Sequence, residues 1–273
     1  MATWSFRCGL FLLLASLPAA GRAYAGADEP LPLPEAVDRA SVAPTSGDAS
    51  VAQGAYLPLT LSPRVGAVPA LVTGQGGYDT ARRSAVTQTF VEVRLWGPLA
   101  LRGGAELGDT TTRLRPTIGA RLQLLTQARH AVDGSVAVFY RAEGFTEPEG
   151  EIETVIAVGR RIGRTVVIGN LAYGQDPEGR ERDGEVRAAA LAAVSERVHL
   201  GVDARGRFDL GSDRAKLRAA NEPTFDLDAG PVAALSVGPV ALTAHAGASV
   251  VRRVGSDATV GLIALAGLGT AFR

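Results

Sequence analysis

The stretch Glu185–Phe208 reads EVRAAALAAVSERVHLGVDARGRF and alternates between apolar and polar side chains along two arms. On the first arm, the apolar face would hold Val186, Ala188, Ala190, Ala192 and Val194, opposite Glu185 and Arg187. On the second arm, it would hold Val198, Leu200, Val202, Ala204 and Phe208, opposite His199, Asp203, Arg205 and Arg207. Successive side chains of a strand point to opposite faces, so the pattern predicts two strands joined by a turn at Ser195–Arg197.

The same alternation recurs along most of the chain and predicts an all-β protein. We expect about twelve strands, with a range of 10–12. Apart from the two arms of the hairpin, they would lie at about Arg64–Thr73, Val86–Trp96, Leu99–Leu107, Thr111–Leu125, Ser135–Phe145, Glu151–Arg160, Arg164–Gly174, Thr224–Ser236, Val240–Val251 and Ala258–Phe272. The first of these is the weakest, because Pro69 interrupts it, Pro63 directly precedes it, and proline cannot donate to a strand ladder.

The connections between these strands alternate between short and mostly longer. The short ones are Gly97-Pro98, Ala128–Ala131, Arg161–Gly163, Ser195–Arg197 and Gly238-Pro239. The others are more polar and comprise Gly74–Ser84, Gly108–Thr110, Thr146–Gly150, Gln175–Gly184, Gly211–Pro223 and Arg252–Asp257. This is typical of an antiparallel up-and-down transmembrane β-barrel, which has tight periplasmic turns and larger outer loops.

The N-terminus has the features of a signal for export. Arg7 precedes the apolar run Gly9–Leu17, and Ala23-Tyr24-Ala25 matches the small-residue cleavage pattern. We therefore expect residues 1–25 to be a signal peptide. Residues 26–55 would be a flexible periplasmic leader, since their proline and polar content cannot support a core. Residues 56–273 would form the barrel.

Composition excludes some classes of protein. The chain has 273 residues with 28 basic and 28 acidic side chains, so it lacks the basic field that a nucleic-acid partner requires. The single cysteine is Cys8, within the expected signal peptide. The mature chain would then contain no disulfide and no cysteine-based metal site.

The export signal, the alternating connections and the nearly uncharged apolar faces together resemble the bacterial outer-membrane β-barrel proteins. The resemblance is one of architecture and covers residues from about 64 to 272. The penultimate Phe272 is similar to their C-terminal aromatic residue, although Arg273 follows it. It implies a Gram-negative outer membrane as the location and its lipid bilayer as the partner. A soluble secreted β-protein remains the alternative, favoured by a low aromatic content of 5%.

In such a barrel the polar faces would line the lumen. The predicted lumen-lining residues carry both charges: Glu92, Arg94, Arg102, Glu106, Arg113, Arg115, Arg121, Arg141, Glu143, Glu153, Glu185, Arg187, Asp203, Arg205, Arg207, Asp226 and Asp228. A water-filled lumen would make the protein a small passive channel that takes up small solutes. A lumen closed by arginine–carboxylate pairs would make it a non-conducting structural or adhesive barrel, whose outer loops bind a ligand.

No residues are assigned to catalysis, cofactors or metals. His245 and Ser249 share a face but are four residues apart on one expected strand, or about 13 Å. This separation is too large for a nucleophile and its base. We therefore expect neither an enzyme nor a cofactor, and the sequence contains no indication of oligomeric state.

Overall fold

The computed structural model describes residues 51, 53–65, 70–107, 114–143, 150–179, 181–213, 215, 217–218 and 223–272. They belong to one compact unit, Ala43–Arg273. The expected signal peptide and residues 26–50 of the expected leader lie outside the described residues, so both remain predictions. Within the described ranges, no helix has the length and hydropathy that a bilayer-spanning helix requires.

The described chain includes twelve strands and the short helix α2 (Gln127–His130). The strands are β1 (Ala70–Asp79), β2 (Ser84–Trp96), β3 (Leu99–Leu107), β4 (Leu114–Leu125), β5 (Asp133–Ala142), β6 (Gly150–Ile162), β7 (Thr165–Gln175), β8 (Arg182–Ala193), β9 (Val198–Asp209), β10 (Pro223–Val237), β11 (Val240–Arg253) and β12 (Thr259–Phe272).

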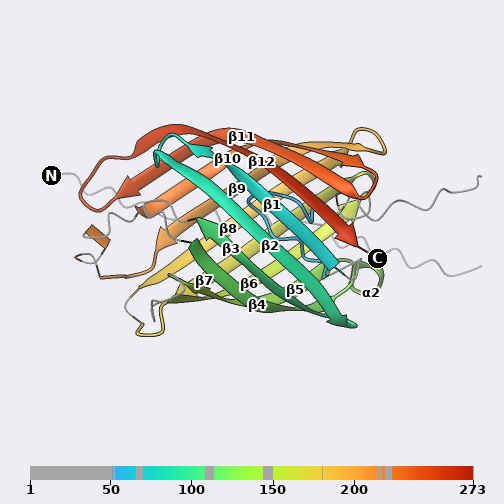
Figure 1. Ribbon diagram of the computed structural model, residues 1–273, viewed down its shortest axis with the longest axis horizontal. Helices are drawn as coiled ribbons and strands as arrows, with labels where there is room; N and C mark the ends of the chain where they lie inside the picture. The colour runs from blue at the N-terminus through green and yellow to red at the C-terminus, as the bar shows by residue number, and fades with distance from the viewer. Residues whose placement is uncertain are drawn as a thin grey trace, which may run out of the picture. The chain divides into compact units, whose positions relative to one another are not determined.

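Every strand pairs antiparallel with its neighbours in the sequence, and β1 pairs with β12 to close the sheet into a barrel (Figure 1). The closing register runs from Ala70 opposite Phe272 to Asp79 opposite Ile263. The predicted twelve-stranded up-and-down barrel is therefore confirmed. The barrel end at which β1 begins and β12 ends is called the terminal end here, and the opposite end is called the loop end.

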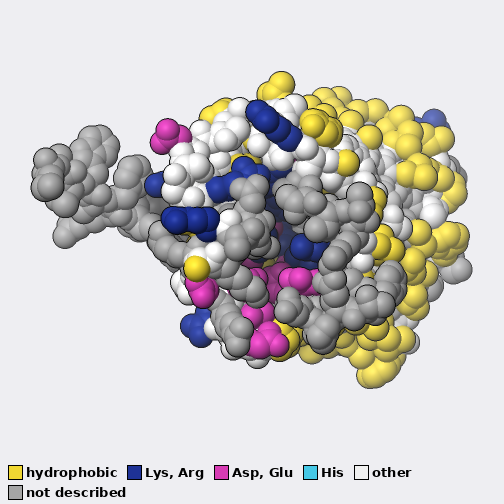
Figure 2. All heavy atoms as spheres, turned by 60° about the vertical axis from the view of Figure 1, so that its left-hand side comes forward, with side chains coloured by type: hydrophobic (Ala, Val, Ile, Leu, Met, Phe, Trp, Pro, Cys, Tyr) yellow, Lys and Arg dark blue, Asp and Glu magenta, His cyan; other side chains and the backbone are white. Residues whose placement is uncertain are grey.

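Large apolar side chains cover the outside of the barrel. Ile118, Val260 and Leu262 are 66%, 71% and 68% exposed. Figure 2 shows hydrophobic side chains over the flank of the barrel and charged ones gathered at the end turned toward the viewer. A soluble β-sandwich would bury its apolar faces between two sheets. A closed barrel with its apolar face outward instead suits a surrounding lipid phase.

Aromatic side chains lie near both rims of this apolar surface. Exposed aromatic residues near the loop end are Tyr78, Tyr140, Tyr173, Phe208 and Phe225, and Trp96 and Phe272 lie at the terminal end. Amphipathic rings favour the boundary between lipid and water. The two sets therefore mark the expected limits of the lipid-facing band.

The predicted bounds of the first strand, about Arg64–Thr73, are wrong, because β1 begins at Ala70 and extends through the glycine-rich stretch expected to be a loop. The glycines allow close contact between strands. A Cβ on Gly77 would lie 1.8 Å from the carbonyl oxygen of Ala264 on β12. Glycine within a strand can mark such an approach as well as a turn, and the sequence alone does not distinguish them.

Candidate functional site

Residues 53–65, called the lumen segment here, form no strand and lie inside the barrel (Figure 1). Their apolar side chains are buried although they precede the first strand: Tyr56, Leu57, Leu59, Leu61 and Val65. Pro58 and Pro63 each lack a backbone N–H, which disfavours a strand ladder here. Buried backbone groups of this segment therefore need partners from the barrel wall.

Side chains of the wall supply these partners at the middle of the lumen segment. The carboxylate of Asp203 accepts a hydrogen bond from the backbone N–H of Leu59 at 2.8 Å and another from the hydroxyl of Thr60. The amide of Asn170 accepts from the N–H of Leu61 at 2.7 Å and donates to the carbonyl of Leu61 at 2.9 Å. Asn170 thus binds both polar groups of one residue, as a neighbouring strand would.

The C-terminal part of the lumen segment is held by charged and amide side chains near the terminal end. Arg64 forms an ion pair with Asp133 at 2.7 Å, and Arg121 donates to the carbonyl of Ser62. The N–H of Val65 donates to the side chain of Gln123 at 3.2 Å. Asp133 is the first residue of β5, so this part of the segment lies near the short turns.

Apolar contacts of the lumen segment divide among separate clusters on the inner wall. Tyr56 clusters with Leu71 and Ala271 at the terminal end, whereas Leu59 clusters with Ile263 and Leu265. Leu57 packs in a group with Val166, Ile168, Ala189, Leu191 and Val232, and Leu61 packs in one with Ala137, Phe139 and Val155. The segment therefore reaches inward from the terminal end, turns near Pro58–Leu61 and returns to it.

These inner-wall apolar residues were missed by the sequence analysis, which assigned only charged residues to the lumen. A signal was present. Thr165–Ile168 and Ala188–Val194 contain few or no polar residues on either face. Residues 54–65 are also mostly apolar, although two prolines interrupt any strand pattern there. A strand that is apolar on both faces indicates burial on both sides.

Beyond the lumen segment, toward the loop end, the inner wall carries ion pairs. Arg187 binds Glu185 at 2.5 Å and Glu153 at 2.8 Å, and Arg141 binds Glu153 and Glu106 at 3.0 Å. Unpaired charges in such an enclosed space would carry a large desolvation cost. Opposite charges here alternate around the wall and neutralise one another locally.

A second group of ion pairs joins the β1–β2 connection to the far wall. Arg82 pairs with Asp79, and it contacts Asp226 and Asp228 at 3.1 Å. Arg205 also binds Asp228 at 2.8 Å. Burial and the charge of Arg205 lower the pKa of Arg82, but the three carboxylates outweigh them and raise the pKa of its guanidinium overall.

Most of the residues expected to line the lumen contribute to these pairs or to cavities beside them. Glu92 and Arg121 pair at 2.6 Å beside the lumen segment, Arg94 and Arg102 line the same cavity, and Asp203 holds the segment itself. Arg115 and Glu143 line a cavity at the loop end, and Arg207 pairs with Asp183. Arg113 lies outside the described residues.

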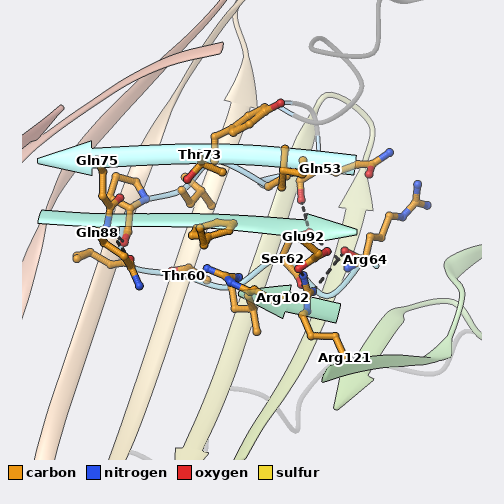
Figure 3. A pocket seen from close by; sticks show the side chains of 18 of the residues that line it. Gln53, Thr60, Ser62, Arg64, Thr73, Gln75, Gln88, Glu92, Arg102 and Arg121 are labelled. Atoms are coloured by element: carbon orange, nitrogen blue, oxygen red, sulfur yellow. Dashed lines mark hydrogen bonds and ion pairs between the residues drawn. The ribbon is translucent and has the colours of Figure 1, made fainter. Parts of the chain in front are cut away.

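Two of the spaces left in the described part of the lumen border the lumen segment. One, of about 90 Å³, lies between the lumen segment and the wall formed by β1 to β4 (Figure 3). The other, of about 260 Å³, has Pro58 and Leu59 on one side and the ion-paired arginines and carboxylates on the other. No group of three or more potential metal-ligating side chains occurs among the described residues.

No protein-family model matches the chain, and no curated protein matches it. Among solved structures, a NanC porin aligns with 74% of this chain and 99% of its own, at a TM-score of 0.54 and 11% identity. The chain has the fold of the outer-membrane β-barrels. The channel DcaP of Acinetobacter baumannii aligns with 74% of this chain and 71% of its own, at a TM-score of 0.43 and 12% identity.

Proposed function

We propose that this chain is a small passive channel of the Gram-negative outer membrane and that the lumen segment constricts it from the periplasmic side. The terminal end would face the periplasm, because the short turns lie there and barrels of this kind keep short turns on that side. The signal-like N-terminus supports export. The apolar outer surface supports the lipid bilayer as the partner.

The observation that carries this proposal is how the lumen segment is bound. It makes no strand pairing with the barrel; it is held by a few side-chain hydrogen bonds, one ion pair and packed leucines. Each such hydrogen bond contributes about 1 kcal/mol. A segment bound in this way can be displaced while the barrel stays closed, which gives a route for solutes.

The ion pairs of the inner wall favour a second role, a non-conducting structural or adhesive barrel. Arg187, Arg141 and Arg205 are each satisfied by carboxylates, as in a lumen that is filled rather than open. Conductance separates this role from the channel. The Ser249 hydroxyl donates to Asp79 rather than to a histidine, so the pair of His245 and Ser249 does not support a nucleophile activated by a base.

Conductance of the refolded chain in planar bilayers tests the proposal. Replacing Leu57, Leu59 and Leu61 by serine removes apolar contacts worth about 1.5–3 kcal/mol each and should raise the mean conductance above that of the unchanged chain. The matched control replaces the same leucines by methionine, which keeps apolar volume, and should behave like the unchanged chain. Absence of conductance in both the unchanged and the serine chain would support the structural role.

A further inference from the structure

Two arginines inside the barrel form no ion pair with any described residue, in contrast to the paired arginines around them. The guanidinium of Arg102 lies over the ring of Phe90, 3.3 Å from its centroid. Its neighbour across the β2–β3 ladder is Glu92, but that carboxylate binds Arg121 at 2.6 Å. Stacking on an aromatic ring orients a guanidinium and leaves its N–H donors available.

The cavity beside Arg102 has the chemistry of an anion site. Arg102 shares it with the amides of Gln75 and Gln88 and the hydroxyls of Thr60 and Thr73 (Figure 3). Among the described residues, its charged lining consists of Arg64, Arg94, Arg102, Arg121 and Arg187 against Glu92. Asp133, Glu92 and the pair Glu153 and Glu185 neutralise three of these arginines, and Arg102 forms no ion pair with any described residue.

Arg115, nearer the loop end, is the second arginine that forms no ion pair with a described residue. It lies opposite Glu106 in the β3–β4 register, but Glu106 binds Arg141 at 3.0 Å. The Nε atom of Arg115 is buried without a hydrogen-bond partner. Arg115 lines both the cavity of about 260 Å³ and the one at the loop end, so it borders the path from the outer mouth. The loop-end cavity also carries carboxylates, among them Glu143, Glu151 and Asp183, so Arg115 is a local cationic position on that path.

The register places the two arginines at successive depths on one side of the lumen. Arg102 and Glu106 are four residues apart on β3, and Arg115 is paired with Glu106. At about 3.3 Å per residue, the two levels are ~13 Å apart along the strand. A guanidinium presents a planar fork of donors that fits a carboxylate or a phosphate.

We propose that Arg115 and Arg102 form two successive binding sites for small oxyanions, so that the channel prefers solutes with a carboxylate or phosphate group. This inference rests on the proposed channel function and names its solute class. An anion entering from the loop end would meet Arg115 first and Arg102 next, beside the lumen segment. Spaced sites of moderate affinity favour conduction, because an ion can enter one and leave it for the next.

Binding is tested first, because it requires no open channel. Calorimetric titration of the detergent-solubilised chain with succinate or with inorganic phosphate should show saturable binding. Arg102→Gln and Arg115→Gln should each weaken it about ten-fold, the effect of losing one charge-assisted hydrogen-bonded contact. The control is Arg197→Gln, which removes the same charge from an exposed periplasmic turn and should leave binding unchanged. Binding of one anion only would identify the preferred oxyanion.

Ion selectivity is tested next, from reversal potentials in a potassium chloride gradient. The unchanged chain should prefer anions, and the double variant Arg102→Gln/Arg115→Gln should lose that preference while Arg197→Gln keeps it. A heat-dependent gel shift confirms that each variant has folded. Conductance with unchanged selectivity and no oxyanion binding would overturn the inference while the channel function stood. Oxyanion binding without conductance would overturn the channel function and leave the binding site.

Discussion

At the scale of single residues, side chains of the inner wall bind backbone groups of the lumen segment that would otherwise pair with a neighbouring strand. Asp203 and Asn170 are almost fully buried, and each binds backbone groups of residues 59–61. Without them, the peptide groups of this segment would be enclosed with no partner, at a cost of about 1–3 kcal/mol per group. The buried carboxylate of Asp203 on a membrane-spanning strand is therefore explained by the lumen segment that it binds inside the barrel.

Asp203→Ala should loosen the lumen segment without opening the barrel. The N–H of Leu59 and the hydroxyl of Thr60 would lose their acceptor. Hydrogen exchange should accelerate about ten-fold at Leu59, equivalent to ~1.4 kcal/mol, and should remain slow in β9 and β10. Ser236→Ala is the control, because the buried Ser236 hydroxyl has no hydrogen-bond partner in the described structure. Equal exchange at Leu59 in both variants would show that Asp203 does not hold the segment.

At the scale of elements, the connection between β1 and β2 is fixed to a distant part of the wall. Arg82 reaches from this turn to Asp226 and Asp228 on β10, which is separated from β1 by β11 and β12. Asp79 and Asp228 have no exposed surface. The turn therefore contributes a cation that these buried carboxylates require.

Arg82→Ala should destabilise the folded barrel by about 3–5 kcal/mol, because it leaves buried carboxylates short of a counter-charge. The unfolding midpoint in urea, followed by the heat-dependent gel shift, measures the effect. Arg83→Ala is the matched control: this neighbouring arginine is exposed and should change stability by no more than about 0.5 kcal/mol. Equal midpoints for the two variants would show that Arg205 alone satisfies the cluster.

At the scale of the whole molecule, the barrel has an apolar exterior and a lumen that contains both packed leucines and ion pairs. The aliphatic residues that alternate along each strand face outward, while Asp203, Asp228 and Ser249 are fully buried. This distribution is the reverse of a soluble protein and is suited to lipid. Charges placed on the outer surface should therefore cost more at mid-membrane than near its edges.

Leu171→Arg should impair folding into lipid vesicles by about 2–4 kcal/mol, the cost of an arginine near the bilayer midplane. Leu171 is 54% exposed at the middle of β7. Ile162→Arg is the control, because Ile162 is 60% exposed but ends β6 at the terminal end, where the cost is about 0–1 kcal/mol. Equal folding yields for both variants would contradict a lipid-facing position for β7.

The sequence by itself determined the strands after the first, their order and their outward faces. Alternation of period two, as in Val198–Phe208, is a local property that depends only on side-chain direction, and the alternating connections limit how consecutive strands can pair. The charged residues expected to face inward could be listed for the same reason. Their partners could not, since Arg82 and Asp228 are 146 residues apart and meet only when β1 closes against β12.

Only the tertiary structure decided where β1 begins and what fills the lumen. Residues 53–65 have no periodicity, so nothing local distinguishes a leader from a chain folded back into the barrel. Their position depends on apolar patches and on Asp203 and Asn170, which come from strands far along the chain and form one surface only after closure. The close contact between Gly77 and Ala264 likewise exists only in the closed sheet. The strand conformation of the glycine-rich stretch therefore depends on the pairing of β1 with β12, which the sequence alone does not reveal.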